Sequence, residues 1–130
     1  MYNELKLCIN KPQSHIDNSY ALIKKLKNIE IPDDYILLSL DVTSLFTNIT
    51  LEAVLNSLER RVRYIHNSSK ILFCKIIEIV KFLFDNQFFE FGGDIFKQIK
   101  AMFMGSTTLP LFADIVMEDC ETECLRNLKN

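Results

Sequence analysis

The stretch Tyr35-Ile-Leu-Leu-Ser-Leu-Asp41-Val-Thr-Ser-Leu-Phe-Thr-Asn-Ile49 joins an apolar run to a single acid, and the expected fold is organised around it. The apolar run is typical of a buried strand, and Asp41 marks its end. A carboxylate at the end of a buried strand is costly unless it is paired or binds a cation. Strand ends are also where sheet proteins usually place their chemistry. Two interpretations of Asp41 follow: a metal ligand, or an N-cap for the turn at residues 43–46.

The composition is that of a packed globular protein. The chain has 130 residues, of which 48% are hydrophobic and 25% are charged. This length fits one domain or part of a larger one. The formal net charge of -2 shows no excess of base, so composition neither suggests nor excludes a nucleic-acid partner.

The cysteines and the apolar runs of the sequence indicate the cellular compartment of the protein. The four cysteines, Cys8, Cys74, Cys120 and Cys124, form no C-x-x-C pair, and Cys74 is expected to be a reduced thiol in the core. The N-terminal residues lack the apolar region of a signal peptide. No run approaches the roughly 20 apolar residues that a membrane span needs. We therefore expect an intracellular protein, nuclear or cytoplasmic, that is not secreted and has no membrane partner.

Apolar spacing and turn residues predict the order of the elements. Helices are expected over residues 17–29, 51–64, 70–84 and 107–128, a strand over 35–41, a tight or short helical turn over 43–48, and a β-hairpin over 87–91 and 94–98. Gly92-Gly93 suits the positive φ angles of a two-residue hairpin turn. The helix over 70–84 has too many apolar residues for one buried face. The pattern predicts an α+β fold, with helices packed on a small antiparallel sheet.

A second stretch whose residues could take part in binding or catalysis is Gln98-Ile-Lys-Ala-Met-Phe-Met-Gly-Ser106. Gly105 and Ser106 lie between a predicted strand and a predicted helix, where backbone N–H groups can face an anion or a base pair. An ordinary strand-to-helix turn explains the same residues. By itself this stretch leaves both interpretations open.

The two stretches together resemble a known family. Residues 38–49 resemble motif A of a reverse transcriptase in the form used by Penelope-like retroelements, and residues 98–117 resemble motif B. The second match keeps Gln98, Met104, Gly105, Ser106, Pro110, Ala113, Met117 and Glu118. The resemblance covers the chain from about residue 10 to its end and implies an RNA-directed DNA polymerase, a nucleotidyltransferase of a retrotransposon.

The resemblance also implies a fold and a division of the chain. It implies a fragment of a right-hand polymerase that comprises the fingers and part of the palm. Residues 1–16 would be an N-terminal lead-in, and 17–130 a partial reverse transcriptase domain. Within that domain, 35–50 would be the palm strand with motif A, 51–104 mainly fingers, and 105–130 the palm helix after motif B.

Roles for single residues follow from the same resemblance. Asp41 would be catalytic and would hold Mg²⁺ with the carbonyl of Val42, in a site that has two ions in the complete enzyme. Ser44 and Leu45 would offer backbone N–H groups to the incoming dNTP, and Phe46 would stack under the deoxyribose and exclude a 2′-hydroxyl. The nucleotide and template would also be contacted by Gln98, Met104, Gly105 and Ser106. The partners implied are an RNA template, a DNA primer and dNTP; the oligomeric state is not implied.

The sequence departs from the family pattern at several positions. Ala101 stands where the family has Gly, Phe103 where it has a small Ala, and Asp114 where it usually has Asn. None of the 130 residues resembles motif C, the hairpin with paired aspartates, so we expect weak or absent Mg²⁺ binding and no polymerisation by this polypeptide alone. The alternatives are a non-catalytic helical interaction or nucleic-acid-binding remnant, and an unrelated α+β binding module.

Other charged and sulfur residues have simple explanations. The clusters Lys24, Lys25, Lys27 and Arg60, Arg61, Arg63 are expected on solvated helix faces, with template phosphates as the alternative. A solvated face also explains the acidic run Glu118, Asp119, Glu121 and Glu123. Cys120 and Cys124 share one helical face, but a zinc site would need two further ligands.

Overall fold

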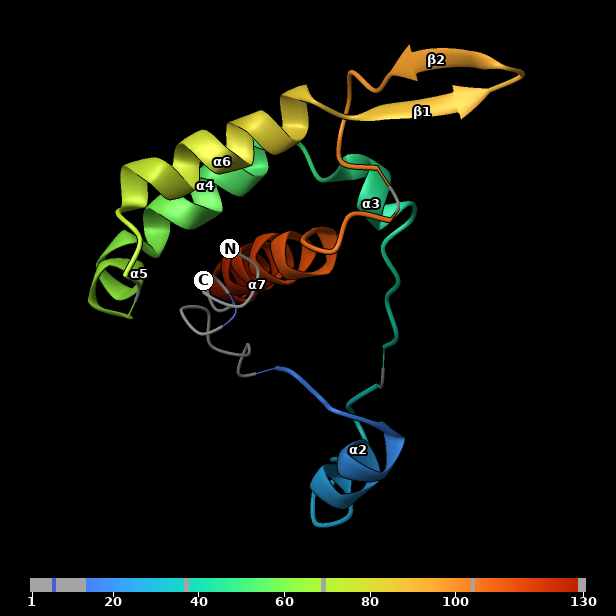
Figure 1. Cartoon of the computed structure of the whole chain (residues 1–130). Helices are drawn as coiled ribbons and strands as arrows, with labels where there is room; N and C mark the ends of the chain where they lie inside the picture. Colours follow the sequence, from blue (N-terminus) through green and yellow to red (C-terminus); the bar gives the residue numbers. More distant parts are fainter. Residues whose placement is uncertain (1–5, 7–13, 37, 69, 104, 129–130) are drawn as a thin grey trace. The chain divides into compact units, whose positions relative to one another are not determined.

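The computed structural model describes residues 6, 14–36, 38–68, 70–103 and 105–128 (Figure 1). It is mixed helical with a small two-stranded antiparallel sheet, an α+β arrangement. The chain divides into a smaller compact unit, Lys11–Thr43, and a larger one made of Met1–Asn10 and Ser44–Asn130. Among the described helices, none is both long and apolar enough to cross a membrane.

The smaller unit contains one helix, α2 (Ser19–Leu26). Asn18 is its N-cap, and the Asn18 Oδ1 atom accepts a hydrogen bond from the backbone N–H of Ala21 at 3.0 Å. The helix has no buried side chain, and Tyr20 and Ile23 are largely exposed. The predicted helix therefore forms, three residues shorter at its C-terminal end than expected, and its apolar stripe is uncovered.

The predicted strand over residues 35–41 is wrong for the residues that the structure describes in that range. They have neither helix nor strand, and Leu38 and Leu40 are 77% and 91% exposed; Leu37 lies outside the described residues. A strand is stable only when its N–H and C=O groups pair with a neighbouring strand. The two described strands of this chain pair with each other, so apolar pattern alone does not make a strand here.

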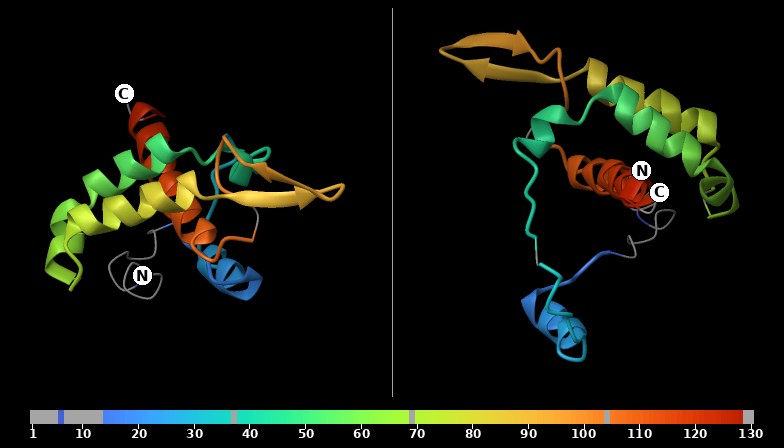
Figure 2. Two further views of the ribbon diagram at one scale, coloured as in Figure 1. Left: turned by 45° about the horizontal axis from the view of Figure 1, so that its top comes forward. Right: turned by 180° about the vertical axis from the view of Figure 1, so that it is seen from behind.

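The core of the larger unit is built by helices. These are α4 (Leu51–Arg60), α5 (Val62–Ser68), α6 (Phe73–Asp85) and α7 (Leu109–Leu128), with the single turn α3 (Leu45–Asn48) before them. Helix α4 packs against both α6 and α7 (Figure 2). The buried side chains include Val54 and Leu58 from α4, Ile76 and Val80 from α6, and Phe112 and Ile115 from α7. Burial of large apolar side chains is the main stabilising term, about 1.5–3 kcal/mol each.

Hydrogen bonds mark the starts of two of these helices. The side chain of Thr50 accepts a hydrogen bond from the N–H of Ala53 at 3.2 Å and starts α4. Helix α7 begins after Thr108, whose carbonyl accepts from the N–H of Phe112 at 3.1 Å, with Pro110 in the first turn. The helix predicted over 51–64 is broken at Arg61, which separates α4 from α5.

Helix α6 buries one stripe and leaves other apolar side chains at the surface. Ile76, Val80 and Phe84 are buried, whereas Phe82 is 63% exposed. Cys74, expected in the core, is a free and exposed thiol, because its position lies off the buried stripe.

The predicted hairpin forms from β1 (Phe88–Phe91) and β2 (Asp94–Lys97). Gly92 and Gly93 both have positive φ, 64° and 89°, as the two-residue turn requires. The hairpin projects from the end of α6, and the side chains of both strands are exposed (Figure 1). Helices packed on this sheet were expected; the helices instead pack on one another, because the hairpin is too short and too polar on one face to cover a core.

Candidate functional site

Asp41 and Val42 lie in the irregular part of the smaller unit, and both are exposed. The side chain of Asp41 makes no hydrogen bond or ion pair with any described residue. It is not the N-cap of α3, because α3 begins four residues later, at Leu45, with Ser44 as its cap residue. The carboxylate is therefore solvated and open to a cation.

Ser44, Leu45 and Phe46 are brought together by the turn that opens the larger unit. Ser44 has left-handed backbone angles, φ 53° and ψ 44°. Its carbonyl accepts hydrogen bonds from the N–H of Thr47 at 3.1 Å, the Thr47 hydroxyl at 2.9 Å and the Asn48 amide at 3.1 Å. The expected short helical turn is thus confirmed, held by the side chains of its own last two residues.

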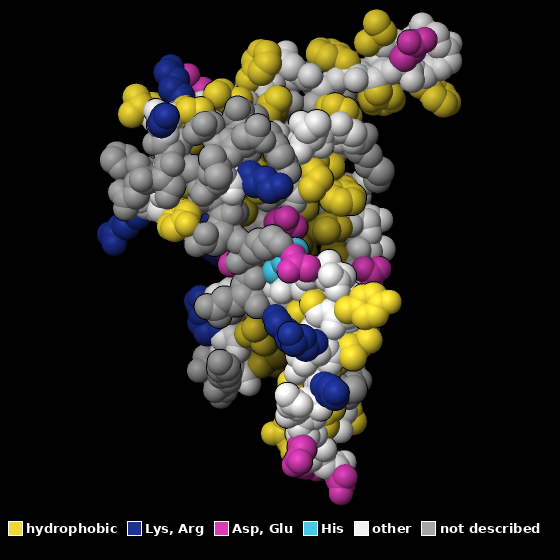
Figure 3. Space-filling model, turned by 60° about the horizontal axis from the view of Figure 1, so that its bottom comes forward, with side chains coloured by type: hydrophobic (Ala, Val, Ile, Leu, Met, Phe, Trp, Pro, Cys, Tyr) yellow, Lys and Arg dark blue, Asp and Glu magenta, His cyan; other side chains and the backbone are white. Residues whose placement is uncertain are grey.

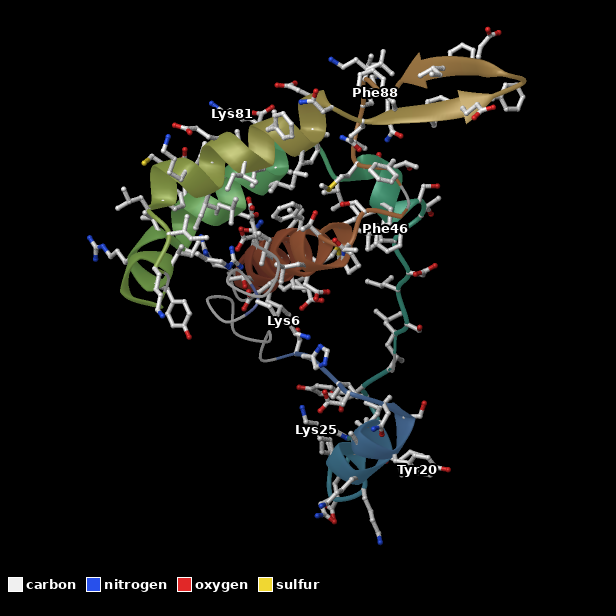
Figure 4. All side chains as sticks on the ribbon, in the orientation of Figure 1. Lys6, Tyr20, Lys25, Phe46, Lys81 and Phe88 are labelled. Atoms are coloured by element: carbon white, nitrogen blue, oxygen red, sulfur yellow. The ribbon has the colours of Figure 1, made fainter. Side chains whose placement is uncertain are left out.

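The side chains of this turn differ in their burial. Leu45 is half-buried and packs against the helical core, and Ile49 after the turn is 2% exposed. Phe46 is 38% exposed and does not belong to the core cluster (Figure 4). The Phe46 side chain is therefore partly accessible to a ligand.

The stretch from Gln98 to Ser106 is an irregular connection between β2 and α7. The Gln98 side chain donates to the Lys100 carbonyl at 2.9 Å, so in this structure its amide is used locally. Ser106 lies just before α7; its hydroxyl is 2.9 Å from that of Thr108, and its carbonyl accepts from the N–H of Leu109 at 3.2 Å. Met104, the remaining predicted contact of this stretch, lies outside the described residues.

Two residues of this connection have unusual backbone angles. Ala101 has a positive φ of 57°, although it is buried and carries a Cβ atom. Gly105 has a φ of 129°, and a Cβ atom there would lie 3.3 Å from the Phe103 ring. Positive φ favours glycine, because a side chain costs about 1–2 kcal/mol in the left-handed region. The connection therefore requires glycine at Gly105 and is strained at Ala101.

A buried glutamine that sequence reasoning missed fixes this connection. Gln87 is 1% exposed. Its Nε2 donates to the carbonyls of Phe84 at 3.2 Å and Ala101 at 3.1 Å, and its Oε1 accepts from the N–H of Phe103 at 2.6 Å. Its backbone carbonyl also accepts from the N–H of Gln98 at 2.9 Å. Gln87 thus joins the end of α6, the base of the hairpin and the 101–103 segment. In the sequence, Gln87 is one of two adjacent amide residues, Asn86 and Gln87, between two phenylalanine-rich runs, and nothing local distinguishes it from Asn86.

Arg61 forms a second polar centre, between α4 and α7. Its Nη2 lies 2.6 Å from Glu118 Oε2 and 2.9 Å from Asp119 Oδ1, and its Nη1 donates to the Ser57 carbonyl at 2.9 Å. Burial acts to lower the pKa of Arg61, but hydrogen bonds and charge interactions with Asp119 and Glu118 outweigh it, so that pKa is raised. The expectation of solvated faces is therefore wrong for Arg61, Glu118 and Asp119.

The surroundings of Asp119 complete this centre. Its Oδ2 atom is buried without a hydrogen bond, but it lies 3.6 Å from Arg60 Nη1, an ion-pair distance that offsets its charge. A pocket of about 150 Å³ adjoins it, with Asn56, Cys120 and Glu123 among its lining residues. These contacts join α4 to α7, so we assign the centre a structural role.

Within the described residues, no group of three or more His, Cys, Asp or Glu side chains could hold a metal ion. No family model, no curated protein and no solved structure matches this chain.

Proposed function

We propose that this chain is the motif A and motif B part of an RNA-directed DNA polymerase of the Penelope-like type. The observation that carries the proposal is the motif A pattern of residues 38–49, with an acid at Asp41 and an aromatic residue at Phe46. The activity is nucleotidyl transfer from dNTP to a primer 3′-hydroxyl on an RNA template.

The backbone of Ala101 gives this proposal independent support. The resembled pattern has glycine where this chain has Ala101, and Ala101 adopts the positive φ that glycine adopts easily. A chance match of sequence letters gives no reason for a left-handed backbone at that position. The positive φ of Ala101 is a conformation that a glycine at this position of the pattern would adopt without strain, and this supports the proposal.

The residues of motif A fit the chemistry of Mg²⁺. Carboxylate and carbonyl oxygens are the ligands that Mg²⁺ prefers, and Asp41 and Val42 would supply one of each. When bound, the ions activate the primer hydroxyl and stabilise the leaving pyrophosphate. Ser44 and Leu45 would orient the triphosphate through backbone N–H groups. Phe46, which is exposed on its turn, would occupy the space that a ribose 2′-hydroxyl needs.

A non-catalytic binding role is the second candidate. The observation in its favour is the amount of apolar side chain left exposed on the hairpin and on α2, for example at Phe91 and Tyr20 (Figure 3). Exposed patches of this kind mark interaction surfaces. In this reading the chain keeps the helical core and binds a partner without catalysing transfer.

A chimera separates the two candidates. Residues 38–49 would replace motif A of an active Penelope-like reverse transcriptase, and Mg²⁺-dependent dNTP incorporation on a primed RNA template would be measured. We expect the chimera to be active, Asp41→Asn to abolish activity, and the matched control Ser39→Ala to retain it. An inactive but folded chimera, or full activity with Asp41→Asn, would refute the polymerase proposal. The 130-residue chain alone is expected to show no incorporation.

A further inference from the structure

The hairpin has two unlike faces. In the register of β1 and β2, Phe88 lies opposite Lys97 and Glu90 opposite Ile95, whereas Phe89 lies opposite Phe96 and Phe91 opposite Asp94. Residues opposite each other in an antiparallel pair share a face. We call the first set, Phe88, Glu90, Ile95 and Lys97, the mixed face, and the second set the aromatic face. The stacked rings of Phe89 and Phe96, with centroids 5.6 Å apart, belong to the aromatic face.

The mixed face combines exposed apolar side chains with two unpaired charges. Phe88 is 57% exposed and Ile95 is 77% exposed (Figure 4 labels Phe88). The side chains of Glu90 and Lys97 make no ion pair or hydrogen bond with residues in the described part of the chain. Together they leave the face electrically neutral, with an acid at one corner and a base at the diagonal corner.

This arrangement is complementary to itself. If a second copy is turned about a two-fold axis that runs along the Phe88–Ile95 diagonal, Phe88 meets Phe88 and Ile95 meets Ile95. The same rotation brings Glu90 onto Lys97 of the second copy and Lys97 onto Glu90 of the second copy. The strands of the two hairpins then cross at a high angle, as in orthogonal packing of sheets. We propose that two copies of this chain associate through the mixed faces of their hairpins, whatever the activity of the chain.

Other two-fold arrangements of the hairpin lack this complementarity. On the aromatic face, Asp94 has no base to meet. At the β1 edge, Glu90 likewise has no base in its own strand. At the β2 edge, two-fold pairing places residues of the same face opposite each other, so Asp94 and Lys97, which lie on different faces, cannot pair.

The size of the mixed face sets the strength of the contact. Phe88 and Ile95 are 57% and 77% exposed, and Glu90 and Lys97 are exposed as well, so the four side chains offer roughly 400 Å² on each copy, given that a whole Phe side chain buries roughly 150–250 Å². The total of about 800 Å² lies below the size of stable interfaces and in the range of weak, reversible ones. We therefore expect a dimer with a dissociation constant of about 10–1,000 μM.

Charge reversal tests the proposal by sedimentation velocity over a range of concentrations. Glu90→Lys and Lys97→Glu should each weaken dimerisation by about thirtyfold, because both contacts of the dimer change from attraction to repulsion. The mixture of these two variants should associate again, since every contact then joins a lysine to a glutamate. The double variant Glu90→Lys/Lys97→Glu should dimerise like the wild type. The control Asp94→Lys, on the aromatic face, should leave dimerisation unchanged.

Three results would overturn the proposal. One is a wild-type protein that remains monomeric at every concentration. Another is a single variant that associates as strongly as the wild type, with its helical circular dichroism intact. The third is a mixture of the two single variants that stays monomeric. A monomeric protein that binds a single-stranded oligonucleotide through the hairpin, with binding lost in Lys97→Glu, would assign this surface to nucleic acid instead.

Discussion

Replacing Gln87 with alanine should cost about 3 kcal/mol of unfolding free energy. The substitution removes the three side-chain hydrogen bonds of a residue that is 1% exposed. It leaves the carbonyl of buried Ala101 without a partner, which costs about 1–3 kcal/mol. The remaining lost bonds and the cavity from truncation add about 1–2 kcal/mol.

The assay is urea unfolding followed by far-UV circular dichroism, with linear extrapolation to water. Gln98→Ala is the matched control: it removes one hydrogen bond, to the Lys100 carbonyl, from a half-buried glutamine and should cost below about 1 kcal/mol. Hydrogen exchange of the Phe103 amide, which donates to Gln87 Oε1, should accelerate in Gln87→Ala. Equal costs for the two alanine variants would refute the assignment of Gln87 as the residue that fixes the 101–103 segment.

Three further predictions concern the other features of the larger unit and motif A. Because Ala101 has a positive φ, Ala101→Val should lower the free energy of unfolding by about 2 kcal/mol or more, whereas Ala101→Gly should stay within about 1 kcal/mol of wild type in the same unfolding assay. A glycine variant less stable than the valine variant would contradict the left-handed backbone at this position. Arg61→Ala should cost about 3 kcal/mol, because it leaves Glu118 and Asp119 partly buried without their cation. Because the pKa of Arg61 is raised in the folded state, the stabilisation from its charge is fully present at every pH below the pKa of the unfolded side chain. It is lost only when the pH rises through the raised pKa, so the free energy of unfolding should keep this contribution at neutral and mildly alkaline pH. In the motif A chimera, Phe46→Ala should raise incorporation of ribonucleotides relative to deoxyribonucleotides by about 10–100-fold in primer extension, and unchanged discrimination would remove Phe46 from the sugar site.

Local signals in the sequence predicted most of the helices and the hairpin. Thr50 marks a helix start because a cap depends on a few neighbouring residues, and the Gly92-Gly93 turn depends only on backbone freedom. The break at Arg61 was not predictable in this way. Its side chain contacts a helix that is more than fifty residues away in the sequence, and local pattern does not reveal such a contact.

The candidate site was predicted less completely, for physical reasons. An apolar run such as residues 35–41 forms a strand only where a neighbouring strand is available to pair with it. The sequence of the run itself does not specify which strand that would be. The turn from Ser44 to Asn48 was predicted because its hydrogen bonds are local. Gln87 was missed because its importance comes from three backbone groups that the fold brings to it.

The central claim is that Asp41 is a catalytic metal ligand, and single-nucleotide incorporation by the motif A chimera tests it most directly. The rate would be measured at saturating Mg²⁺ with Asp41 and with Asp41→Asn. Loss of a ligand to the ions removes several kcal/mol of transition-state stabilisation, so the rate should fall at least about a thousandfold. A fall of less than about tenfold, in a chimera that is active with Asp41, would contradict the assignment.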